Sequence, residues 1–207
     1  ESIFDEPFLA KLKELHEKYG SVFSLYCFDN ETWDKLTNKF FDEFSKNSNW
    51  LKIGYHTGRN SSVENGLSQS DYNGFVNNVC RVCGINSIDR LPRLHGFEGT
   101  LENVQGLRNA NGGIIGLLST DDSRTPYYMN ESQKNYLSTK GKLIDLQNGL
   151  VFFPTIMRLD WFISGFTSDY EYQTPIKNTP YEELKYRYGI SENANRYRDL
   201  VIFVHEW

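Results

Sequence analysis

Five residues with chemically useful side chains each stand at or near the end of a short apolar run that is typical of a buried strand. They are His56, His95, Asp121, Asp122 and His205. In a parallel α/β fold the carboxyl ends of the strands gather at one edge of the sheet, so we expect these side chains to converge although they are distant in sequence. Neutral imidazole and carboxylate oxygen are natural ligands of a divalent ion such as zinc. The pattern therefore predicts a cation site or an acid–base site at that edge.

Each of these residue types also has a structural interpretation. His56 could be a buried histidine whose ring is satisfied by neighbouring backbone, and its position does not decide between that role and a functional one. His16 lies within a helical pattern and is expected on the surface, and Asp29 is expected to cap a helix. Cys80 and Cys83 form a C-x-x-C sequence that ends a helix instead of opening one, so we expect unreactive thiols.

Apolar strands alternate with amphipathic helices along most of the chain. The expected strands are 22–28, 50–56, 88–95, 114–118 and 200–205. Strands that are apolar on both faces and separated by helices indicate right-handed βαβ units and a parallel sheet. We therefore predict a single α/β domain over residues 1–207, with a barrel-like sheet. A β-hairpin with the turn Asn148-Gly149 is expected near 142–155, as an insertion into that domain.

Composition excludes several classes of function. The 207 residues carry 22 basic and 27 acidic side chains, and a formal charge of −5 gives no positive field for a phosphate backbone. We therefore expect no nucleic-acid partner. No apolar run approaches the roughly 18 residues of a membrane span, so no span is expected. Aromatic residues make up 15% of the chain, and such rings either fill a core or line a groove in which sugar rings stack.

Four segments taken together resemble the polysaccharide deacetylase family. Residues 53–57 (IGYHT) look like the strand whose histidine opens the family's metal motif, and residues 90–96 (RLPRLHG) are similar to its Arg-x-Pro groove motif. Asp121-Asp122 lies where the family has acidic residues of its fourth motif, with Asp160-Trp161 as a rival match. His205 looks like the histidine that ends the last strand.

The resemblance implies a distorted (β/α) barrel and a metal-dependent esterase that removes acetyl groups from a polysaccharide or another glycan. The implied metal ligand is His56, for zinc or a similar divalent ion. The implied catalytic residues are Asp121, Asp122 and His205, which would orient water and protonate the leaving group. The implied substrate-binding residues are Tyr55, Arg93, His95 and Trp161.

Two departures from the family pattern leave alternatives open. The second histidine of the metal motif is replaced by Asn60, a poor substitute for imidazole, so the metal is either weakly bound or absent. The family's first-strand Asp-Asp pair is not in the chain, so either that strand was removed or is disordered, or this relative lacks it and its barrel is incomplete at the N-terminus. One alternative is a non-catalytic relative that binds a glycan. The other is a glycosidase with two carboxylates among Glu98, Asp121, Asp122 and Asp160, about 5 to 5.5 Å or 6.5 to 9.5 Å apart.

Overall fold

The computed structural model describes residues 6–28, 37–57, 68–120, 124–155, 157–158, 182 and 201–203. The chain divides into two compact units, residues 1–117 and 118–207, and each is considered by itself. In the described part of the chain, no helix has both the length and the apolar character needed to cross a membrane.

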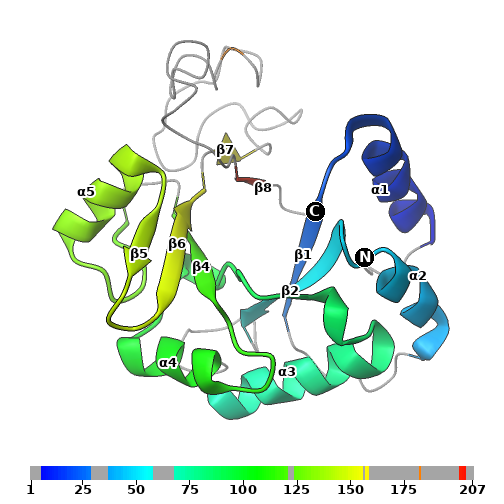
Figure 1. The fold of residues 1–207 in the computed structure, drawn as a ribbon, viewed down its shortest axis with the longest axis horizontal. Coiled ribbons are helices and arrows are strands. Elements are labelled where there is room, and N and C mark those ends of the chain that lie inside the picture. Colours follow the sequence, from blue (N-terminus) through cyan, green and yellow to red (C-terminus); the bar gives the residue numbers. More distant parts are fainter. Residues whose placement is uncertain are drawn as a thin grey trace. The chain divides into compact units, whose positions relative to one another are not determined.

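The first unit contains a three-stranded parallel sheet in the order β1-β2-β3 (Figure 1). Its strands are β1 (Phe23–Phe28), β2 (Leu51–Thr57) and β3 (Ile88–Asp89). The register pairs Leu25 with Ile53, and Ile53 with Ile88. The apolar runs predicted these three strands and their parallel pairing. The third strand is much shorter than the predicted 88–95, because the Asp89 side chain accepts the Leu91 amide and Pro92 has no amide to donate.

The described helices of the first unit are α1 (Glu6–Tyr19), α2 (Phe41–Lys46), α3 (Gln69–Val82) and α4 (Leu101–Asn109), with short 3₁₀ turns η2 (Asn38–Phe40), η3 (Ile85–Ser87) and η4 (His95–Phe97). Among these helices, α3 packs against the sheet and against α4. Capping boxes at Ser68 and Thr100 begin α3 and α4. Helix α3 buries Tyr72 and Phe75 beside the fully buried Tyr55 of β2, with ring centroids 5.3 and 5.0 Å from that of Tyr55.

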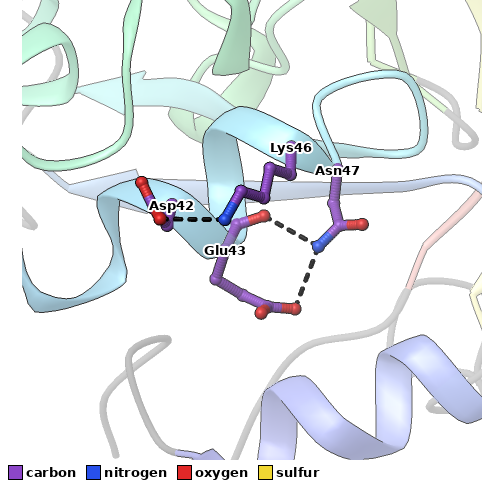
Figure 2. Close-up of polar contacts among 4 residues, drawn as sticks. All are labelled: Asp42, Glu43, Lys46 and Asn47. Carbon is purple, nitrogen blue, oxygen red and sulfur yellow. Dashed lines mark hydrogen bonds and ion pairs between the residues drawn. The ribbon is translucent and has the colours of Figure 1, made fainter.

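Helix α2 ends in a side-chain cap. Asn47 Nδ2 donates to the Glu43 carbonyl oxygen at 2.8 Å and to Glu43 Oε1 at 3.0 Å, while Lys46 pairs with Asp42 one turn earlier at 2.8 Å (Figure 2). Asn47 Oδ1 in turn accepts the indole N–H of Trp50 at 3.2 Å. The Asn47 side chain therefore satisfies a backbone carbonyl at the end of α2 and holds the indole ring of Trp50, which directly precedes β2.

The second unit contains a mixed three-stranded sheet in the order β4-β6-β5 (Figure 1). Its elements are β4 (Gly116–Ser119), which crosses the boundary between the units, α5 (Glu131–Lys140), β5 (Leu143–Asp145) and β6 (Leu150–Pro154). Strands β5 and β6 pair antiparallel, which confirms the predicted hairpin, with a loop over residues 146–149. A short parallel pair, β7 (Met157–Arg158) with β8 (Ile202–Phe203), completes the described strands.

The predicted distorted (β/α) barrel of the polysaccharide deacetylase type is wrong. The described strands form two separate three-stranded sheets and one two-stranded pair, and they do not close into a barrel. Closure requires an unbroken ladder around the ring. Here the first sheet ends at the two-residue β3, and the antiparallel β5 gives the second sheet an edge that parallel βαβ units would not produce. The mixed α/β class itself is what the structure has.

Candidate functional site

His56 lies one residue before the carboxyl end of β2 and is half-buried between buried neighbours. Its Nδ1 lies 2.5 Å from the carbonyl oxygen of Arg93. A carbonyl oxygen only accepts hydrogen bonds, so Nδ1 carries the proton and donates it. In the neutral ring the lone pair is then on Nε2. A backbone contact thus fixes both the tautomer and the orientation of this imidazole.

His95 begins η4 and meets the Nε2 side of His56. Its Nδ1 lies 3.3 Å from His56 Nε2, and the two rings stand at 86° with centroids 5.2 Å apart. Both side chains are half-buried. The structure therefore confirms the expected convergence for these two histidines, although His95 lies in η4, beyond the end of β3.

The loop between β3 and η4 is held by a buried cation and a strained turn. Arg93 is 8% exposed, and its Cζ lies 4.4 Å from the centroid of the Phe97 ring. Phe97 has φ 58° and follows Gly96 at φ 63°. A left-handed φ is unfavourable for a bulky residue, so the cation–π contact and the burial of Phe97 must offset it. This packing fixes the carbonyl that orients His56 and the turn that begins at His95.

A second set of contacts supports the same loop from β1. The Tyr26 hydroxyl donates to Asp89 Oδ2 at 3.1 Å and lies 3.3 Å from the Leu91 carbonyl oxygen, while Asp89 Oδ1 accepts the Leu91 amide at 2.8 Å. The Tyr26 ring lies across Gly54, its register partner in β2. A methyl group at residue 54 would come within 2.2 Å of Tyr26 Cδ1, so only glycine leaves room for the ring.

Of the other predicted site residues, Arg93 contacts His56 through its backbone carbonyl oxygen, while its side chain is buried against the Phe97 ring. Tyr55 is 0% exposed and packs against α3, which is the position of a core residue and not of a groove wall. Glu98 follows η4 and is exposed. The predicted residues outside the described part of the chain are Asn60, Asp121, Asp122, Asp160, Trp161 and His205.

His16 and the cysteines show which chemistry-bearing side chains serve packing. His16 was expected on the helix surface, but it is half-buried, stacks on Trp50 at 4.5 Å and lies 2.8 Å from the Ser21 carbonyl oxygen through Nδ1. Burial raises the pKa of the Cys83 thiol to about 12 and also raises that of Cys80. Both thiols are free, and their raised pKa values agree with the predicted lack of reactivity.

Two facts bear on whether a metal ion fits this site. Two nitrogens bound to one tetrahedral ion at about 2.0–2.1 Å stand about 3.3–3.4 Å apart. The His56–His95 spacing of 3.3 Å agrees with that value. Among the residues that the structure describes, however, no group of three or more potential ligand side chains gathers. The described residues therefore have two ring nitrogens at a spacing that one ion could bridge, and they do not form a complete ligand set.

From the sequence, His56 and His95 were expected at one edge of the sheet but were given different roles, His56 as a metal ligand and His95 as a substrate-binding residue. Their direct contact follows from the topology, because β2 and β3 are sheet neighbours and the chain leads from each of them to a histidine. Comparison with known proteins adds nothing further: no family model matches the chain, and neither curated proteins nor solved structures give a significant match.

Proposed function

We propose that this chain hydrolyses an acetyl group on a glycan with the help of a divalent ion for which His56 is a ligand. The observation that carries the proposal is the fixed orientation of the His56 imidazole. Its Nδ1 donates to the Arg93 carbonyl oxygen, and its Nε2 lies 3.3 Å from Nδ1 of His95. Metal-binding histidines are ordinarily held in this way, with the distal ring nitrogen bonded to a backbone carbonyl or carboxylate. The half-buried position leaves the pair accessible to solvent.

The protein's own residues supply orientation. The Arg93 carbonyl holds the His56 ring, and the Arg93–Phe97 contact holds that carbonyl. A divalent ion, when bound, polarises an acyl carbonyl and lowers the pKa of water toward neutrality. In this proposal Asp121 or Asp122 orients the attacking water and His205 protonates the leaving group, roles that the motif resemblance suggests for them.

The substrate class rests on the motif resemblance of residues 53–57 and 90–96. Because the barrel of that family is not found, the resemblance is one of local motifs and not of fold. Asn60, which stands where the family has its second histidine, favours a second candidate function: a glycan-binding protein without catalysis. Glycan binding that is indifferent to chelators would support that second candidate.

The test is release of acetate from an N-acetylated chitooligosaccharide by the whole chain. We expect release that a chelator abolishes and zinc restores. His56→Gln should lower the rate by at least about a hundredfold, since loss of a catalytic metal or acid–base group costs about that much or more. His16→Gln is the matched control, because His16 is also half-buried and bonded to a backbone carbonyl. Release at the wild-type rate by His56→Gln would refute the role of His56, and binding without release would favour the second candidate.

A further inference from the structure

The spacing of His56 and His95 is compatible with two uses of the pair. At 3.3 Å, His95 Nδ1 can donate a hydrogen bond to His56 Nε2. The same distance matches the separation of two nitrogens bound to one tetrahedral ion. An ion that replaces the proton between the two rings would therefore need no large movement of either ring.

We propose that His95 is the second protein ligand of the cation and takes the place of the histidine that Asn60 replaces. Its Nδ1 and the Nε2 of His56 come from different segments but face each other, so the site does not need two histidines on one motif. This inference extends the proposed function, on which its catalytic meaning rests.

The donor set also selects the kind of ion. Two imidazole nitrogens suit zinc, cobalt or nickel, whereas magnesium and calcium prefer oxygen ligands. The Arg93 carbonyl acts as the outer partner that fixes the first ligand. We therefore expect binding of zinc and no binding of magnesium at this pair.

The supporting loop gives the pair its rigidity. His95 is followed by two residues with left-handed backbone, Gly96 and Phe97, and the buried Phe97 ring packs under Arg93. Arg93 is in the same loop as His95, so one packed segment sets the position of both imidazoles. A ligand pair held in this way loses little freedom when an ion binds.

The experiment measures zinc affinity of the whole chain by competition with a chromophoric chelator, with magnesium as the second ion. His95→Gln and His56→Gln should each weaken zinc binding by at least about tenfold, because even loss of an outer partner costs about 10- to 100-fold. His16→Gln should bind zinc as the wild type does. Circular dichroism shows that each variant is folded, and two ligand variants allow the test to proceed if one of them is not.

The outcomes are distinct. No zinc binding by the wild type, or wild-type affinity in a folded His95→Gln or His56→Gln variant, would overturn the inference. Zinc bound through both histidines without acetate release would leave it standing and refute the proposed activity. Acetate release that zinc removal abolishes, together with unchanged release and unchanged zinc affinity in a folded His95→Gln variant, would overturn the inference and leave the proposed activity standing.

Discussion

Replacing Gly54 by alanine tests whether the packing of the Tyr26 ring over residue 54 stabilises the sheet that carries His56. A methyl group at residue 54 would lie 2.2 Å from Tyr26 Cδ1 and 2.3 Å from Cε1, far inside van der Waals contact of about 3.5–4.0 Å. The Tyr26 ring must therefore leave its place. Its hydroxyl would then lose the contacts with Asp89 Oδ2 and the Leu91 carbonyl oxygen.

The expected loss in the free energy of unfolding can be estimated from these contacts. Overpacking in a filled interior costs about 1–3 kcal/mol. Each lost hydrogen bond adds about 0.5–1.5 kcal/mol. The lower backbone entropy of alanine in the unfolded chain offsets about 0.4–1 kcal/mol of this. We expect Gly54→Ala to lower the free energy of unfolding by about 3 kcal/mol, most of it through Tyr26.

Urea unfolding followed by circular dichroism measures this in a double-mutant cycle. In a Tyr26→Ala background the obstructing ring is gone, so adding Gly54→Ala should cost less than about 0.5 kcal/mol. Gly106→Ala in α4 is the control, because a Cβ there meets its nearest atom at 3.6 Å and alanine favours the helix. An equal loss for Gly54→Ala with and without the Tyr26 ring would refute the steric reasoning.

Two further predictions concern titratable groups. Partial burial raises the pKa of Asp145, but bonds from Asn148 and Tyr128 outweigh this and hold it below its ordinary value. Asp145→Asn should therefore lower the free energy of unfolding at pH 7, measured in urea, by about 1 kcal/mol. This difference should shrink as the pH falls below about 4 through the lowered folded-state pKa, and a difference that does not change with pH would contradict the assignment. Burial raises the pKa of Cys83 to about 12, so only about 10⁻⁴ of the thiol is ionised at pH 8. Iodoacetamide should alkylate Cys83 at least about a hundredfold faster in urea than in the folded chain, by peptide mass spectrometry, and rapid labelling of the folded chain would contradict this burial.

Strands and helices with clear periodicity could be predicted from the sequence, and those set by local hydrogen bonding could not. The apolar runs gave β1 and β2 to within a residue at each end. Helix α5 escaped prediction because its apolar residues form no stripe and only Leu137 is buried. Its signals were the capping box from Asn130 to Gln133 and the left-handed Gly141 that ends it. The prediction of a barrel was wrong because the pattern of apolar residues does not reveal that β3 stops after Asp89.

The site was predictable where it follows from topology. The histidines were expected to converge at one edge of the sheet, and His56 and His95 do meet, although His95 lies in η4 and not at the end of a strand. The contact between His56 and the Arg93 carbonyl oxygen could not be predicted, because every residue has a backbone carbonyl and the side-chain type does not show which one is used. Tyr55, in contrast, could have been placed correctly. Successive side chains of a strand point to opposite faces, so Tyr55 and His56 could not both line one groove.

That alternation explains how one strand serves both the core and the site. Ile53 and Tyr55 lie on one face of β2, where Tyr55 packs against α3. Gly54 and His56 lie on the other face, where the missing side chain of Gly54 admits the Tyr26 ring.

The Tyr26 hydroxyl then reaches Asp89 and Leu91, at the start of the loop whose Arg93 carbonyl holds His56 and whose next turn begins with His95. The absence of a side chain at residue 54 is thus linked by direct contacts to the position of two imidazoles. We therefore expect changes at Gly54 or Tyr26 to alter the histidine pair although neither residue contacts an imidazole ring.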